Sequence, residues 1–370
     1  MSIEAHDVVI IGGGIIGLST AYYLARAGLD VCILEKQAIA LGSSGRCAGG
    51  IGQSHRAPPD LPIAKFAVEQ WQAISAEMDI DIQFRQHSNL RLAMNEAHMA
   101  DLLAMVEREQ KGGLDVCFVD RAEVKRRVPF VSDVYLGAVL SPTDGSADPY
   151  RACSALARVA ARLGVLIHQP REVTELQVSQ GKIQGVLTNE GPVAARQVLI
   201  AAGAWAASIG QMAGVKIPAT NMRSHLLVTE RLPHFIDPFL STDIYGYFRQ
   251  TMAGSVLIGF PARPLLTPDM SVTHQAVAVA ARRAVDIIPC LRDAAMLRGL
   301  TGYTVWTSDY LPVVGPVRDI EGLYVAAAFS GLGFAIGPGI GRLVAELIAA
   351  GQPSLPIDMY RLERFAQPSA

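Results

Sequence analysis

The sequence has few of the residues that build metal centres, disulfide scaffolds or nucleic-acid surfaces. Its five cysteines are scattered and form neither a C-x-x-C pair nor a cysteine–histidine ligand spacing. We therefore expect buried free thiols in a reducing compartment, and we predict no metal site. The formal net charge is −2 and only 18% of the residues are charged, which argues against a nucleic-acid partner.

Long apolar runs are also missing. No run reaches the length of a membrane span, so we predict no transmembrane segment. The pattern of a signal peptide is absent too, so we expect a cytoplasmic location, or peripheral contact with a membrane through an electron-transfer partner. Half of the 370 residues are hydrophobic, enough for two domains with extensive burial against a large cofactor or a partner.

The most informative stretch lies near the N-terminus. The β-branched run Val8–Ile11 predicts a buried parallel strand, and the periodicity of 15–27 predicts a helix. A second strand is expected over 31–34. Strand, helix and strand in this order form the βαβ unit that binds dinucleotides in many α/β proteins.

Three glycines with G-x-G-x-x-G spacing join the first strand to the helix. Gly12 allows the tight turn, Gly14 lets the backbone approach a pyrophosphate, and Gly17 lets the helix lie close to the strand. The helix N-terminus at Ile15 and Ile16 offers N–H groups to the phosphates. Glu35 ends the second strand, where it can accept the hydroxyls of a ribose. This acid disfavours NADP, and the stretch alone leaves FAD and NAD open.

A loop dense in glycine and serine, 41–53, follows the second strand. Small residues let backbone N–H groups face a phosphate or a flat ring, and Arg46 can meet a pyrophosphate. The alternative is a flexible surface linker. The candidate cofactor residues here are Lys36, Ser43, Ser44, Arg46, Cys47, Ala48, Gly49 and Gly50.

The middle of the chain has a different pattern. Alternating segments at 224–229, 245–250 and 255–260 predict strands of an antiparallel sheet. Between the two patterns, Asp148 is placed as the N-cap and Pro149 as the first residue of a helix. The chain is therefore expected to return from an inserted segment to the nucleotide-binding part at this point.

With these motifs the chain resembles the FAD-dependent amine oxidoreductases of the D-amino-acid-oxidase type. The S-S-G-R-x-A-G-G stretch carries the resemblance, and A-A-G-A-W at 201–205 and S-G-L-G-F-A at 330–335 extend it. The resemblance implies an α/β fold: a Rossmann-type FAD-binding domain with an inserted α+β substrate domain built on a mainly antiparallel sheet. The FAD-binding domain is expected at 1–80, 145–218 and 295–370, and the substrate domain at 81–144 and 219–294.

The resemblance also implies further cofactor contacts. FAD is the expected cofactor, and FMN at a subunit interface is a candidate for an additional one. The helix after 330 would stabilise the negative charge that grows at flavin N1–C2=O. Leu332 stands where the family usually has histidine. The further cofactor residues are Val173, Ala202, Gly203, Trp205, Gly302, Gly331, Leu332, Gly333, Phe334, Ala335 and Ile336.

The candidate substrate residues come from the second pattern. Period two places Tyr245, Tyr247 and Arg249 on one face of a strand, with a solvent-facing strand as the alternative. The candidate catalytic residues, expected to face the substrate, are Tyr247, Arg249, Tyr303 and Trp306.

The sequence departs from the resembled oxidases at basic positions. Gly52, Thr304 and Ala335 stand where relatives place basic residues. Either a substrate carboxylate is bound by other groups, such as Arg46, Arg56 or Arg249, or the substrate differs from that of these relatives. Leu257 stands where one oxidase has an oxygen-activating lysine, which favours a dehydrogenase.

The activity that the resemblance implies is oxidation of the C–N bond of an amine or amino acid by hydride transfer to flavin N5. The expected substrate is a small secondary amine such as an opine, a proline-type imino acid or sarcosine. The chain would be the catalytic β subunit of a heteromeric dehydrogenase, close in character to opine, proline or hydroxyproline dehydrogenases. Its partner subunits would carry FMN, FAD or an iron–sulfur centre. The alternatives are a self-contained glycine or D-amino-acid oxidase that produces hydrogen peroxide, and a non-catalytic flavin-binding assembly subunit.

Overall fold

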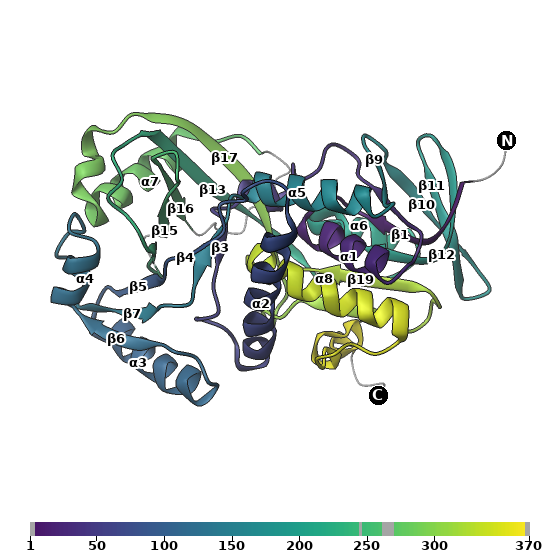
Figure 1. The fold of residues 1–370 in the computed structure, drawn as a ribbon, viewed down its shortest axis with the longest axis horizontal. Coiled ribbons are helices and arrows are strands. Elements are labelled where there is room, and N and C mark those ends of the chain that lie inside the picture. Colours follow the sequence, from purple (N-terminus) through teal and green to yellow (C-terminus); the bar gives the residue numbers. More distant parts are fainter. Residues whose placement is uncertain (1–3, 244–245, 261–269, 367–370) are drawn as a thin grey trace.

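The structure, a computed structural model, describes residues 4–243, 246–260 and 270–366. Two eight-stranded sheets lie next to each other along the long axis of the molecule, as Figure 1 shows. The chain passes from one sheet to the other several times. Both sheets are therefore assembled from segments that are far apart in the sequence.

The first sheet is built around β1, whose Val8–Ile11 segment is buried. β1 pairs in parallel with β2 and with β12, and β12 also pairs in parallel with β19. An antiparallel hairpin, β10–β11, extends the sheet beyond β12. The strands are β1 (Glu4–Ile11), β2 (Val31–Leu34), β9 (Leu166–His168), β10 (Val173–Ser179), β11 (Lys182–Thr188), β12 (Gly191–Ile200), β18 (Val313–Pro316) and β19 (Leu323–Ala327).

The helices around this sheet include one long apolar helix, α8. A Cβ on Gly341 of α8 would lie 2.4 Å from Cβ of Ser19 in α1, so the two helices approach closely through small residues. Asp148 caps α5 by accepting from the N–H of Arg151, which confirms the predicted helix start. The helices are α1 (Ile15–Arg26), α2 (Leu61–Glu77), α5 (Pro149–Arg162), α6 (Ala206–Gln211) and α8 (Gly333–Ala350).

By length and composition, α8 could cross a membrane, which the sequence analysis did not anticipate. Its mean hydropathy is 1.3, but 67% of it is buried inside the protein, in contact with α1 and α2. The buried position is that of a core helix.

The second sheet has the order β17-β13-β16-β15-β14-β5-β7-β6 and is antiparallel except between β14 and β5. The mainly antiparallel second sheet and the Rossmann-type first part confirm the predicted fold class. The strands are β5 (Asn89–Ala93), β6 (Cys117–Asp120), β7 (Gly137–Ser141), β13 (Thr220–Arg231), β14 (Phe239–Ser241), β15 (Tyr247–Gln250), β16 (Ser255–Phe260) and β17 (Met296–Trp306). The helices of this part are α3 (Glu96–Lys111), α4 (Arg121–Arg127) and α7 (His274–Ile287).

A small third sheet joins the two parts. It consists of β3 (Gly50–Ile51), β4 (Arg85–Gln86) and β8 (Gly145–Ser146).

One predicted boundary differs from the structure. The sequence placed the residues after 295 in the FAD-binding domain, but β17 pairs with β13 along its length, from Thr220↔Trp306 to Thr229↔Met296. Residues 296–306 therefore belong to the second sheet. Periodicity identifies a strand but does not show which distant strand it pairs with, so this boundary could not be read from local sequence.

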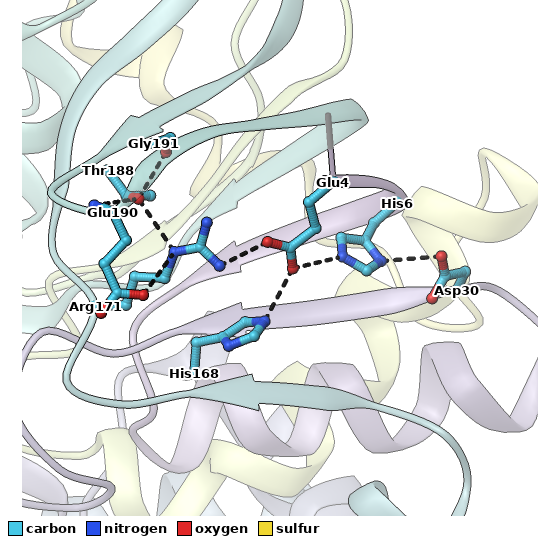
Figure 2. Close-up of polar contacts among 8 residues, drawn as sticks. All are labelled: Glu4, His6, Asp30, His168, Arg171, Thr188, Glu190 and Gly191. Atoms are coloured by element: carbon cyan, nitrogen blue, oxygen red, sulfur yellow. Dashed lines mark hydrogen bonds and ion pairs between the residues drawn. The ribbon is translucent and has the colours of Figure 1, made fainter. Parts of the chain in front are cut away.

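A polar network ties the start of β1 to β9 and to the segment before β10 (Figure 2). One oxygen of Glu4 lies 3.1 Å from Nε2 of His6 and 2.9 Å from Nε2 of His168. The other oxygen accepts from Nη1 of Arg171 at 2.7 Å. Burial alone would raise the pKa of Glu4, but these hydrogen bonds together lower it to about 2.

Candidate active site

A cavity of about 940 Å³ is lined by residues of both large sheets. This volume lies near the upper end of the range for small-molecule sites. At one end the walls come from the turn after β1 and from the end of β2. At the other end they come from β5, β14 and β15 of the second sheet. The cavity therefore connects the nucleotide-binding motif with the inserted sheet.

The turn between β1 and α1 has no room for side chains. Gly12 has a φ of +114°, and a Cβ there would lie 2.6 Å from the carbonyl oxygen of Ala201. A Cβ on Gly17 would lie 2.1 Å from the carbonyl oxygen of Gly12. Glu35 accepts from the N–H of Gly13 at 2.9 Å, so its carboxylate is held beside this turn. The close approaches at Gly12 and Gly17 fit the tight turn and the helix–strand contact that the motif predicts.

The glycine- and serine-rich loop is anchored rather than free. The hydroxyl of Ser43 donates to the carbonyl of Tyr303 at 2.5 Å, and Arg46 donates to the carbonyl of Thr301 at 2.8 Å. Ser44 accepts from the N–H of Ile15, the first residue of α1, at 3.0 Å. These bonds attach the loop to β17 and to α1, which argues against the surface-linker alternative.

The start of α8 forms another part of the wall. Gly331 has a φ of +83°, and the residues from Gly331 to Ala335 line the cavity. Trp71 donates from Nε1 to the carbonyl of Ala335 at 2.8 Å, which fixes the first turn of the helix. Two helix N-termini, at α1 and α8, thus open toward one cavity. Helix N-termini and side-chain-free turns suit the pyrophosphate and the electron-rich ring edge of a flavin dinucleotide, so the residues fit FAD.

Most of the predicted cofactor residues line this cavity. Within the described part of the chain, Gly17 and Ile336 do not, because Gly17 packs against Gly12 and Ile336 is buried in the core. Those that line the cavity are Gly12, Gly14, Ile15, Ile16, Glu35, Lys36, Ser43, Ser44, Arg46, Cys47, Ala48, Gly49, Gly50, Val173, Ala202, Gly203, Trp205, Gly302, Gly331, Leu332, Gly333, Phe334 and Ala335.

The predicted substrate residues divide into two groups. Tyr247, Tyr303 and Trp306 line the cavity, whereas Tyr245 lies outside the described residues. The expectation that Arg249 faces the substrate is corrected, since Arg249 is not among the described residues that line the cavity. Its guanidinium is buried and donates to the carbonyl of Ala147 at 2.6 Å.

Several cavity residues were missed by the sequence reading. Arg91 and Asn89 on β5 line the cavity together with Phe239 and Thr242. The sequence feature that could have identified them is the alternation along β5. Leu90 and Leu92 are fully buried, and Asn89 and Arg91 face the opposite side of the strand. The position of β14 beside β5 is a long-range pairing that local sequence does not show.

His55 also lines the cavity. Burial, and secondarily the charge of Arg91, lower its pKa to about 4. The imidazole is therefore neutral at physiological pH. The loop that carries it is held by Glu109 of α3, which accepts from the N–H of His55 at 2.6 Å.

Comparison with known proteins agrees with this geometry. A family model described as "FAD dependent oxidoreductase" matches residues 7–347. The chain belongs to the FAD dependent oxidoreductase family. This membership confirms the resemblance noted in the sequence, the enzyme class and the predicted cofactor, FAD.

Three relatives of this oxidoreductase illustrate its similarity. Dimethylglycine dehydrogenase of Rattus norvegicus is 27% identical over 97% of the chain, but the chain spans only 44% of that protein's length. Sarcosine oxidase subunit beta of Arthrobacter sp is 29% identical, with 98% of this chain and 91% of that one covered. The crystal structure of L-proline dehydrogenase from P. horikoshii superposes with a TM-score of 0.93 at 32% identity, and the match covers 98% of both chains.

Proposed function

We propose that this oxidoreductase oxidises the C–N bond of a small secondary amine that carries a carboxylate, such as sarcosine, a proline-type imino acid or an opine. The observation that carries the proposal is the continuous cavity of about 940 Å³, which begins at the dinucleotide turn and ends among polar and aromatic residues of the inserted sheet. The names of the three relatives support the amine class, since sarcosine, proline and dimethylglycine are all N-substituted amino acids.

The residues of this chain would act by positioning and by excluding water. FAD, when bound, supplies the acceptor for the hydride that leaves the carbon beside nitrogen. Phe239 and Tyr247 stack with ring centroids 5.8 Å apart and form an apolar wall at the end of the inserted sheet. Trp306 is fixed from the other side by its bond to the hydroxyl of Thr304 at 2.8 Å. Rigid walls of this kind hold a reacting C–H bond in one orientation.

We also propose that the chain works as the catalytic β-type subunit of a heteromer and passes electrons to a partner subunit. The support is the near full-length similarity to a protein named as a beta subunit. Leu257 adds to this, because it is buried with Ala48 and Val228 and provides no cation where the resembled oxidase has an oxygen-activating lysine. A self-contained oxidase remains the second candidate.

An anaerobic reduction assay tests the amine proposal. The FAD-loaded protein is mixed with sarcosine, proline, an opine, glycine and D-alanine, and the absorbance of oxidised flavin is followed near ~450 nm. Bleaching by N-substituted amino acids, and slower or no bleaching by the primary amines, is the expected result. A fully loaded protein that no amine bleaches would contradict the proposal.

The electron acceptor is tested separately. After reduction, air is admitted to the single chain and hydrogen peroxide is measured. Slow reoxidation, accelerated by an artificial dye acceptor, is expected of a subunit that depends on a partner. Rapid stoichiometric peroxide formation would favour the self-contained oxidase.

A further inference from the structure

The basic residues that line the cavity differ in what holds them. Lys36 lies 3.7 Å from the ring centroid of Trp205, and Arg171 is paired with Glu4. Both are at the dinucleotide end. Arg46 is bound to the carbonyl of Thr301 on β17. Lys36 and Arg171 therefore lie where the adenosine belongs, and Arg46 lies in the loop that is expected to meet the pyrophosphate.

Arg56 is poorly placed to bind a ligand. Its Nη2 donates to the carbonyl of Gly52, while Nε and Nη1 are inaccessible to solvent and have no hydrogen-bond partner among the described residues. The negative charges that act on it most strongly are those of Asp144, Asp60 and Glu109. A ligand could reach the buried nitrogens of Arg56 only if the side chain moved.

Arg91 differs from the other four. It lies on β5, at the inserted-sheet end of the cavity, and its side chain is 18% exposed. Among the described residues, Arg91 donates from Nη1 to the carboxylate of Asp243 at 2.7 Å. An arginine has five N–H donors in a planar fork, so one carboxylate partner leaves donors for a second.

The surroundings of Arg91 suit a bound carboxylate. The cavity residues Asn89, on the same strand, and Thr242, next to Asp243 in the chain, are polar, and His55 is neutral. The strand is rigid, since Leu90 and Leu92 anchor it in the core of the second sheet. A fixed guanidinium that is mostly buried in a cavity wall forms stronger charge-assisted bonds than one in open solvent.

We propose that Arg91 binds the substrate carboxylate through guanidinium nitrogens that Asp243 does not occupy. The inference rests on the proposed function, because it names the group that selects the substrate class: amines with a carboxylate near the nitrogen. It also replaces the three arginines that the sequence suggested, Arg46, Arg56 and Arg249, with a residue on β5.

Binding of a matched pair of ligands tests this role without turnover. The FAD-loaded protein is titrated calorimetrically with anthranilate and with aniline, which has the same ring and amine but no carboxylate. Anthranilate should bind more tightly than aniline to the wild-type protein. Arg91→Gln should weaken anthranilate binding by at least about thirtyfold, as expected when one partner of a desolvated charge pair is removed, and should leave aniline binding unchanged.

Asp243→Asn is the matched control. It removes the ion pair but leaves the guanidinium in place, so anthranilate binding should be retained. If Arg91 served only to hold Asp243, the two variants would weaken binding alike, and the inference would be overturned. Arg91→Lys keeps the charge without the planar fork and should lie between wild type and Arg91→Gln. This variant also provides the answer if Arg91→Gln does not fold.

Two further outcomes separate this inference from the proposed function. If amines bleach the flavin but Arg91→Gln binds anthranilate like wild type, or wild type binds anthranilate no more tightly than aniline, the role of Arg91 is refuted and the function stands. If no amine bleaches the flavin while anthranilate binding still depends on Arg91, the amine chemistry is refuted and the carboxylate site stands.

Discussion

The network around Glu4 should make the protein sensitive to acid in a defined pH window. Replacing Glu4 with Gln removes the negative charge that faces Arg171, His6 and His168 and keeps the shape of the side chain. The pKa of Glu4 is about 2 in the folded protein, against an ordinary value of 4.5. A lowered carboxyl pKa stabilises the fold at pH values above 4.5, and this stabilisation is lost as the pH falls toward 2.

The magnitude follows from the same values. A difference of about 2.5 pH units corresponds to about 3 kcal/mol of folding free energy. The Glu4 side chain is 29% exposed, so water screens part of the interaction. We therefore expect Glu4→Gln to lower the free energy of unfolding by about 2 kcal/mol at pH 7.

Urea unfolding at pH 7, pH 5 and pH 3 measures this effect. The difference between wild type and Glu4→Gln should be full at pH 7, still large at pH 5 and clearly smaller at pH 3. Glu190→Gln is the control, since that carboxylate lies 3.8 Å from Arg171 and is 58% exposed, and its loss should change stability by less than about 0.5 kcal/mol. Equal losses in both variants, or a Glu4→Gln difference that does not change with pH, would refute the reasoning.

Two further predictions concern the cavity. Gly17→Ala places a Cβ 2.1 Å from the carbonyl oxygen of Gly12, so α1 must shift. The free energy of unfolding should fall by about 1–3 kcal/mol, and flavin absorbance should show a lower FAD content. Gly42→Ala is the control, since the space around its Cβ is open and its stability should be kept. An NMR titration of the His55 ring should give a pKa near 4. Arg91→Gln should raise this pKa, because it removes a nearby positive charge. A wild-type pKa near the ordinary value of 6.5 would contradict the burial of His55.

Local patterns in the sequence were enough for the dinucleotide end. Gly12, Gly17 and Glu35 have their roles within a unit of about thirty residues, in which spacing determines geometry. The N-cap at Asp148 is similarly local, because the capping bond reaches only to Arg151. Such features depend on neighbours that the sequence itself places close together.

The substrate end depends on contacts between distant segments. Arg249 was expected in the cavity because strand periodicity assigns it a face, but that face packs against the carbonyl of Ala147. β17 joins the second sheet by pairing with β13, and β5 reaches the cavity beside β14. No local pattern encodes such pairings. The arginine that remains in the cavity could be identified only once these segments were placed together.

The central position of β1 has a consequence for synthesis on the ribosome. Ile11 at the end of β1 pairs with Ile200 of β12, so one edge of this apolar strand has no partner until residue 200 has emerged. At the usual rates of translation this takes about 10–40 s. During that time the nascent chain exposes an unpaired β-branched strand edge. Soluble yield should therefore depend on chaperones that cover the N-terminal segment during translation.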